Sequence, residues 1–509
     1  MKDIDTILMK VLIDTNVIIK REDDVPISVE VAKFFELAES AKISFYVHPA
    51  SIDDIKRDQN EERRNVILSK IQAYLPLPNP PNPSSDKTFQ NIITKSKNEN
   101  DEVDSKLLYA VYHNAVDYLI TEDMGLHKRA KDHQIRDRII TISDAVDIFR
   151  KRNPEPISPI TPPALHHKYL YEIDLYDPFF DSLRQAYPDF NEWFERKSRE
   201  HRRSFVYYLE NESIGAILIY NEKEEEAIAG NPPLPPKLRC KISTMKSLRT
   251  GQKLGELFLK LAIFIAVKGG CKEVYLTHFD EENDYLVALI EKYGFEHVST
   301  LPTSEKVYLK PLFVDVDTAA EYTPIEILNK YYPSYYDGEF VKKWIIPIQP
   351  KYHQKLFTDY KSRQSKLSEF EGNFIIEGNT ITKAYICRSN VKKIDPGDLV
   401  FFYRSEDEKA ITTLGVVEDT KRTEDVDEIF RIVAKRTVYS IEELEKWEKP
   451  VLIILFRQIF HYDAPIKLDC IGTTAPQSIS SLSDESYNQI KKHGNKYGCL
   501  AVSKAKIRL

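Results

Sequence analysis

A proline-rich stretch at residues 152–167, RNPEPISPITPPALHH, divides the chain and limits what it can fold into. Proline has no backbone N–H and fixes its own φ angle, so a run like this without apolar periodicity behaves as an extended linker. At 509 residues the chain is also too long for one hydrophobic core. We therefore expect a linker at 151–167 and about three domains in all.

Composition sets the class of protein but not its function. The chain is 42% hydrophobic and 30% charged, which is typical of a soluble globular protein. No apolar run approaches the roughly 18 residues of a membrane span, so we expect no membrane segment. The five cysteines lack paired spacing, which argues against disulfides or a zinc site and favours the cytoplasm. A net charge of −7 argues against a protein that coats nucleic acid over its whole surface.

Residues 1–150 alternate short apolar strands with amphipathic helical stretches, which predicts an α/β layer with a parallel sheet. Four acids lie where these strands end or the next helices begin: Asp14, Asp54, Asp104 and Asp123. The carboxyl ends of parallel strands meet at one edge of a sheet, so these acids are expected to gather there. Mg²⁺ or Mn²⁺ would relieve their repulsion and would support phosphodiester hydrolysis. The alternative is that each acid caps a helix.

Three pieces of this domain, VLIDTNV, HPAS and VDYLITEDMGL, resemble a PIN-domain ribonuclease over residues 10–150. The resemblance implies that the four acids are the metal-binding and catalytic residues, supported by Asn16 and Thr121. Asp54 departs from the family pattern, which more often has Glu at that position. Asp101 or Glu102 are alternatives to Asp104. The competing interpretation is a PIN-like scaffold that has lost its nuclease activity.

Residues 168–312 change to a mixed α+β order around a strand, a glycine-containing turn and a long helix, STMKSLRTGQKLGELFLKLAIFIAVKGG. Backbone N–H groups at a helix start bind pyrophosphate when small residues let it approach. Four residues of the turn are placed for this: Arg249, Gly251, Gln252 and Gly255.

Together with the later YLVALIEKYGFEHVS, this pattern resembles the GNAT acetyltransferase fold and implies acetyl-CoA as the cofactor. The phosphate loop departs from the family at Thr250 and Lys253, although Lys253 would offset phosphate charge. The usual tyrosine acid falls on Ile290, with Tyr285 or Tyr293 as replacements. The candidate bases are Asp280 and Glu281. The alternative is a GNAT scaffold retained for packing or partner contacts.

Residues 313–344 are expected to form a connector, and residues 345–509 are strand-rich, which predicts a small β-barrel with peripheral helices. The segment KAYICRSNVKKIDPGDLVFFYRSEDEKAITTLGVVED resembles a PUA-like domain of the EVE or ASCH type. Phe402 and Tyr403 beside Arg404 are candidates to stack on a base and hold phosphate. Their alternation suits a barrel core equally well.

The sequence thus predicts a multidomain α/β protein with a PIN-like nuclease domain (1–150), a GNAT-like domain (168–312) and a PUA-like nucleic-acid-binding domain (345–509). The leading hypothesis is a Mg²⁺- or Mn²⁺-dependent ribonuclease coupled to acetyl-CoA binding. By analogy only, it suggests a toxin of a toxin–antitoxin or defence system. The expected partners are RNA, an antitoxin or translation component, and further copies of the chain. The alternatives are an acetyltransferase acting on RNA or a translation protein, with the PIN domain used for docking, and a non-catalytic nucleic-acid-binding regulator.

Overall fold

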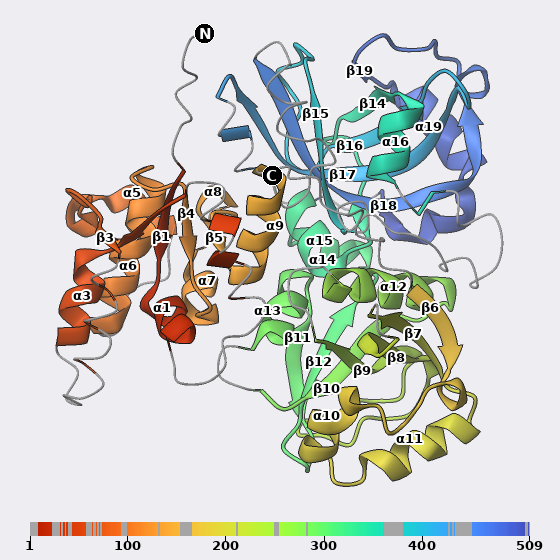
Figure 1. The fold of residues 1–509 in the computed structure, drawn as a ribbon. Coiled ribbons are helices and arrows are strands. Elements are labelled where there is room, and N and C mark those ends of the chain that lie inside the picture. The colour runs from red at the N-terminus through yellow and green to blue at the C-terminus, as the bar shows by residue number, and fades with distance from the viewer. Residues whose placement is uncertain are drawn as a thin grey trace.

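The computed structural model describes most of the chain in separate stretches. These are residues 9–22, 43–56, 74–92, 99–130, 133–152, 165–209, 212–248, 254–280, 284–357, 359–360, 380–425, 428–429, 432, 450–503 and 507, with single positions between 31 and 38 and between 64 and 71. Figure 1 shows an N-terminal α/β body in red and orange beside a middle body in yellow and green, with the last body in cyan and blue above the middle one.

The N-terminal sheet has five parallel strands in the order β3-β2-β1-β4-β5. Its strands are β1 (Lys10–Ile13), β2 (Ser44–Val47), β3 (Leu75–Pro76), β4 (Tyr118–Ile120) and β5 (Ile139–Ile140). Val11 and Ile13 pack into one apolar cluster while Leu12 packs into another, because alternate side chains of a strand face opposite sides. Helices therefore cover both faces, and the predicted parallel α/β layer is confirmed.

Several helices surround this sheet, and their starts decide which acids can be helix caps. They include α1 (Thr15–Glu22), α3 (Pro49–Lys56), α6 (Glu99–Tyr112), α7 (Met124–Arg129) and α9 (Ile142–Arg152). Asp104 lies in the second turn of α6, and Asp54 lies near the end of α3. Neither acid opens its helix, contrary to the sequence-based expectation.

The middle sheet has seven strands in the order β11-β12-β10-β9-β8-β7-β6. They are β6 (Leu165–Tyr169), β7 (Arg203–Tyr208), β8 (Ile214–Glu224), β9 (Arg239–Ser247), β10 (Glu273–His278), β11 (Glu296–Thr300) and β12 (Lys306–Pro311). Only β9 and β10 pair in parallel among its described strands. Helix α12 (Leu254–Lys268) makes the crossover between them, and α13 (Tyr285–Lys292) follows β10. Helices α10 (Asp181–Ala186) and α11 (Phe190–Arg199) connect β6 to β7.

The last sheet has six strands in the order β15-β18-β17-β16-β14-β19. They are β14 (Lys343–Ile348), β15 (Thr382–Cys387), β16 (Leu399–Arg404), β17 (Ala410–Thr423), β18 (Val451–Lys467) and β19 (Ser480–Ser481). The outer strands β15 and β19 do not pair with each other, so the described strands form an open sheet and do not close the small barrel that we expected. Helices α16 (Pro350–Leu356) and α19 (Asp484–His493) flank it.

The middle and last segments share one core. A single apolar cluster contains Leu257 of α12, Ile327 of α15 (Pro324–Tyr331) and Leu399 of β16. Residues 313–344, which we expected to be a connector, contribute α14 (Val316–Ala319), α15 and β13 (Tyr335–Tyr336). Strand β13 pairs with β20 (Ala501–Val502) near the C-terminus. This segment is therefore folded structure between two packed layers (Figure 1). No helix among the described residues is long and apolar enough to cross a membrane.

Candidate functional site

The two parallel strands of the middle sheet separate before they end. Strands β9 and β10 pair from Arg239 opposite Glu273 to Ile242 opposite Leu276, and no further pairs follow. The last five residues of β9 and the last two of β10 therefore face each other without ladder hydrogen bonds. Backbone groups that have lost a strand partner need another one, so this opening suits an extended ligand that lies between the strands.

A bulge in β9 lies at the start of this opening. Ile219 of β8 pairs with Thr244, while the next residue, Tyr220, pairs with Ile242, so Ser243 is an extra residue in β9. A bulge bends its strand and frees backbone groups, and such irregularities are common next to active sites. The bulge thus lies directly after Ile242, the last residue of β9 that pairs with β10.

The start of α12 borders the opening. Arg249, Gly251, Gln252 and Lys253, the predicted phosphate-binding residues, lie outside the described residues. Gly255, in the first turn of α12, is described. A Cβ atom on Gly255 would lie 2.9 Å from Leu289 Cδ2 of α13 and 3.7 Å from Met245 Cε of β9. A larger residue here would have to displace the end of the Leu289 side chain, so Gly255 favours close packing of α12 on α13. The phosphate role of this residue stays a prediction.

A histidine–aspartate pair stands at the end of β10. His278 is the last residue of the strand, and its Nε2 lies 2.6 Å from Asp284 Oδ2. The other oxygen of Asp284 accepts the N–H of Val287 at 3.0 Å, so Asp284 also caps α13. The side chain of His278 is 25% exposed, and its Nδ1 has no hydrogen-bond partner in the described part of the chain. A carboxylate on one ring nitrogen fixes the tautomer and leaves the other nitrogen as a base. The sequence pattern predicts Asp280 and Glu281 as bases and gives no sign of this pair. Asp280 forms an ion pair with Lys306 at 2.5 Å, and Glu281 lies outside the described residues.

The two tyrosines that we considered as acids both have carboxylate partners. Tyr293 is fully buried and donates its hydroxyl to Glu256 of α12, and burial raises its pKa well above the usual value. Tyr285, the first residue of α13, donates to Glu122 of the N-terminal body. Neither hydroxyl therefore points freely into the opening.

A second carboxylate, Glu305, directly precedes β12, which pairs with the edge of β10 opposite to β9. Thr277 Oγ1 donates to Glu305 Oε1 at 3.1 Å, and Thr303 Oγ1 donates to Glu305 Oε2 at 3.0 Å. Tyr187, at the end of α10, donates to Glu305 Oε1 at 3.4 Å. Burial first, and the Glu305 charge second, raise the pKa of Tyr187 to about 12. The Tyr187 ring lies 5.6 Å from that of Phe279.

Asp14 of the N-terminal body lies just past the end of β1 and is nearly enclosed by hydrogen-bond donors. Thr121 Oγ1 donates to Asp14 Oδ2 at 2.6 Å, Asn16 Nδ2 donates to the same oxygen at 2.9 Å, and the Thr15 N–H donates to Oδ1 at 2.7 Å. Burial raises the pKa of Asp14 above its usual value, the donors lower it, and Asp123 raises it further. Asn16 and Thr121 thus hold Asp14 through hydrogen bonds.

Asp104 faces the same edge but has a cation beside it. Arg129 Nη1 lies 3.1 Å from Asp104 Oδ2, and Arg129 Nη2 donates to Ser105 at 2.7 Å. Burial raises the pKa of Asp104 to about 6 despite Arg129, and the charges of Asp123 and Asp14 add to the increase. Three of the four predicted acids therefore influence one another at one edge of the sheet.

These acids do not make a metal site by themselves. Asp123 caps α7 by accepting the Gly125 N–H at 2.7 Å. The side chain of Asp54 lies outside the described residues, as does that of Asp101. Among the side chains that are described, no group of three or more His, Cys, Asp or Glu is arranged to hold a metal ion. The described donor set thus does not fit Mg²⁺ or Mn²⁺.

The predicted nucleic-acid-binding residues of the last body lie inside it. Phe402 is fully buried, Tyr403 is 5% exposed and the Arg404 side chain is 1% exposed. Phe402 packs against the rings of Phe357 and Phe456, with centroids 4.9 and 4.7 Å away. None of the three predicted side chains therefore offers a free face to a base, and the core alternative describes them.

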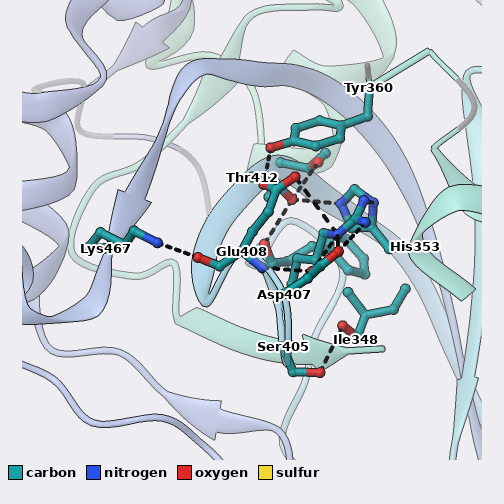
Figure 2. Close-up of polar contacts among 11 residues, drawn as sticks. Ile348, His353, Tyr360, Ser405, Asp407, Glu408, Thr412 and Lys467 are labelled. Atoms are coloured by element: carbon teal, nitrogen blue, oxygen red, sulfur yellow. Dashed lines mark hydrogen bonds and ion pairs between the residues drawn. The ribbon is translucent and has the colours of Figure 1, made fainter. Parts of the chain in front are cut away.

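Arg404 belongs instead to a polar network that runs from buried His353 to Asp407, whose side chain is 45% exposed. Its Nε lies 2.9 Å from Asp407 Oδ1 and its Nη1 lies 3.4 Å from His353 Nδ1. His353 Nε2 lies 2.8 Å from Thr412 Oγ1. Figure 2 shows His353 and Thr412 in this network, with Tyr360 above them and hydrogen-bonded to Glu408. Burial, and then the nearby cations, lower the pKa of His353 to about 3.

The comparisons with known proteins place the acetyl-transfer fold in the middle body. Residues 168–295 match the model of the acetyltransferase (GNAT) family. A search of curated proteins found no match. One similar solved structure is Ard1 from Thermoplasma volcanium, with 14% sequence identity, coverage of 29% of this chain and 95% of that chain, and a TM-score of 0.22. Another is the ASCH protein from Zymomonas mobilis, with 14% sequence identity, coverage of 30% of this chain and 94% of that chain, and a TM-score of 0.23. A third is the NatC complex bound to Gag peptide and CoA, with 15% sequence identity, coverage of 29% of this chain and 99% of that chain, and a TM-score of 0.20. These TM-scores lie well below 0.5, so we draw no conclusion from them.

Proposed function

We propose that this chain, whose residues 168–295 form a GNAT acetyltransferase domain, is an acetyl-CoA-dependent N-acetyltransferase with its reaction centre at the end of β10. The observation that carries the proposal is the opening between β9 and β10 with the His278–Asp284 pair at its mouth. An extended cofactor needs free backbone groups, and acyl transfer to an amine needs a base. The free backbone groups and the base both lie at the end of β10.

The chain offers acetyl-CoA a place that suits its shape. The unpaired end of β9 beyond the Ser243 bulge supplies backbone groups for the extended arm of the cofactor. The start of α12 would hold the phosphates, because helix N-termini bind anions. Acetyl-CoA would supply an acetyl group on a thioester, which is activated toward attack by an amine.

His278 then acts as the general base. Asp284 accepts a hydrogen bond from Nε2–H and holds the ring, so Nδ1 takes a proton from the acceptor amine. The amine nitrogen forms a bond to the acetyl carbon as the carbon–sulfur bond breaks. Because Tyr285 and Tyr293 are engaged with carboxylates, the leaving thiolate takes its proton from solvent or from His278.

The test is binding and turnover with the full chain. We expect calorimetry to show acetyl-CoA binding at micromolar affinity, roughly the −8 kcal/mol typical of such sites. A coupled thiol assay should show CoA release that depends on an added amine. A chain that binds no acetyl-CoA and releases no CoA with any amine would exclude the proposal.

Metal-dependent cleavage of RNA is a second candidate, and one observation favours it. Asp14 and Asp104 lie at the carboxyl edge of a parallel sheet, where burial first, and the nearby charge of Asp123 in addition, disfavour their ionised forms. Such an edge suits a cation. The described side chains alone do not complete a metal site. RNA cleavage that requires Mn²⁺ and disappears in Asp14→Asn would support this activity.

A further inference from the structure

A stack of flat side chains lies on the middle body where β6 leads into a short 3₁₀-helix, Leu170–Glu172. The rings of Tyr169 and Tyr171 are nearly parallel, with a centroid distance of 5.1 Å and an angle of 9° between their planes. The Arg203 guanidinium lies 5.4 Å from the centre of the Tyr169 ring and donates to the Tyr169 hydroxyl at 3.3 Å. The His201 ring stands nearly perpendicular to both tyrosines, with centroids 6.2 and 5.8 Å away. The two tyrosines therefore form a platform that its neighbours hold in place.

One face of this tyrosine platform is open to solvent. Tyr171 is 56% exposed, although Tyr169 covers one face of its ring and His201 stands against it. Its other face therefore lies in solvent. Strand β6 is the outermost strand of the middle sheet and lies on the side away from the N-terminal body (Figure 1). Because the ring is already held by its neighbours, a second flat group can stack on it at a small cost in conformational entropy.

Positive charge surrounds the platform. The segment ERKSREHRR, residues 195–203, has five lysine and arginine residues and two glutamates, in a chain whose net charge is −7. This local excess of three positive charges runs from the end of α11 to the start of β7, and α11 lies against the 3₁₀-helix that carries Tyr171. The side chain of Arg199 is 77% exposed. Glu172, next to Tyr171, directs its carboxylate to the N–H of Tyr169 at 2.7 Å. The rim of the platform thus suits an anionic ligand.

We propose that Tyr171, backed by Tyr169 and surrounded by the cations of residues 195–203, binds single-stranded nucleic acid by stacking on an unpaired base. Every base has a flat π-face, so this stacking requires no particular sequence, and the cations neutralise the phosphates on either side. In a duplex the base faces are already stacked on one another, so the platform acts on single strands. A sugar also stacks on tyrosine, but a neutral sugar has no charge to match the cations. This inference goes beyond the proposed acetyl transfer and does not depend on it.

The experiment measures the binding of a labelled oligoadenylate of about ten nucleotides to the full chain, by fluorescence anisotropy without acetyl-CoA. We expect Tyr171→Ala to weaken binding about fivefold or more, the loss that follows removal of one stacked base. Tyr171→Phe keeps the ring and should bind like wild type. Phe340→Ala is the matched control, because Phe340 is also 56% exposed but precedes β14, and it should bind like wild type. Because Tyr171 is exposed, Tyr171→Ala should keep the wild-type melting temperature.

Two further probes separate base stacking from attraction between charges. An abasic oligonucleotide of the same length has the same phosphates without bases, and a duplex of the same length has no free base face along its stack. Both should be held by charge alone, so Tyr171→Ala should leave their affinity for the chain unchanged. A neutral oligosaccharide should not bind measurably.

Four results would overturn the proposal. They are no binding of the oligoadenylate to wild type, equal binding by wild type and Tyr171→Ala, equal losses in Tyr171→Ala and Phe340→Ala, and an equal loss for the abasic strand. Binding of the oligosaccharide that depends on Tyr171, in place of binding of the oligoadenylate, would assign the platform to sugars and also overturn it. Oligoadenylate binding that depends on Tyr171 in a chain that releases no CoA would support the nucleic-acid surface and count only against the proposed acetyl transfer.

Discussion

Tyr285, the first residue of α13, donates its hydroxyl to Glu122 of the N-terminal body, next to the residue that caps α7. The other Glu122 oxygen accepts the Ile142 N–H at 2.9 Å, so Glu122 joins α13 to its own sheet edge. Lys128 and Glu291 form a second link at 3.0 Å, but both side chains are nearly half exposed. The N-terminal body is therefore fastened to the helix whose cap, Asp284, holds His278.

We predict that Tyr285→Phe weakens this docking more than Glu291→Gln does. A hydrogen bond to a charged group contributes roughly 1.5–3 kcal/mol, whereas exposed ion pairs contribute about 0–1 kcal/mol. Limited proteolysis should therefore release the N-terminal body faster in Tyr285→Phe. Because Asp284 is adjacent, kcat for acetyl transfer should also fall. Equal protease sensitivity of both variants would show that this hydrogen bond does not hold the bodies together.

A buried ion pair joins the other two bodies and gives a second prediction. Lys260 of α12 lies 3.0 Å from Asp359, which also lies 2.9 Å from His461. Removing one partner of a buried pair costs about 3–5 kcal/mol, because the other charge stays buried. Lys260→Met should lower the free energy of unfolding by that amount, and adding Asp359→Asn should restore most of it. A double variant as unstable as the single one would contradict the ion-pair explanation.

Buried histidines predict instability in acid. Burial lowers the pKa of His353 to about 3, and His48 and His167 fall to about 4. Below pH 6.5 the unfolded chain binds protons that the folded histidines do not, so stability is lost as pH falls from 6.5 toward 3. Each histidine contributes a slope of about 1.4 kcal/mol per pH unit. In urea titrations between pH 5 and 7, His353→Gln should show a smaller slope than wild type. An unchanged slope would mean that His353 is protonated in the folded chain.

Asp104 has the opposite dependence. Its folded pKa of about 6 lies above the usual 3.8, because of burial and like charges. An acid with a raised pKa destabilises the fold once ionised, so this stability is lost as pH rises from 3.8 to 6. Asp104→Asn should therefore raise the melting temperature at pH 7.5 and leave it unchanged near pH 4. A lower melting temperature at pH 7.5 would mean that the pairing with Arg129 outweighs burial.

Much of the fold follows from local patterns. The apolar runs around Leu12 and Leu119 are short and flanked by helical stretches, and they form the predicted parallel strands. The strand, glycine turn and long helix predicted a GNAT-like domain, and residues 168–295 match the model of that family. The sequence analysis did not predict that α12 packs against two layers, although its sequence LGELFLKLAIFIAVK is apolar on nearly all sides. A helix that is apolar on all sides must be buried on all sides, and ten of its residues are.

Other features depend on contacts that no local pattern encodes. His278 and Asp284 meet only because the chain reverses between β10 and α13. Glu305 reaches Thr277 because β12 pairs antiparallel with β10. For Phe402 and Tyr403, alternation in the strand fits a core and a binding face equally. Burial decides this, and burial depends on the layer that covers the strand.

The proposed acetyl transfer is tested most directly by the His278–Asp284 pair. The measurement is amine-dependent CoA release by the full chain, with acetyl-CoA affinity measured in parallel. His278→Ala should lower kcat by about 10²- to 10⁴-fold, the usual contribution of a general base, with acetyl-CoA affinity unchanged. Asp284→Asn keeps the cap of α13 and should lower kcat without loss of stability. Amine-dependent CoA release that continues at the wild-type rate in His278→Ala would contradict the proposed reaction centre.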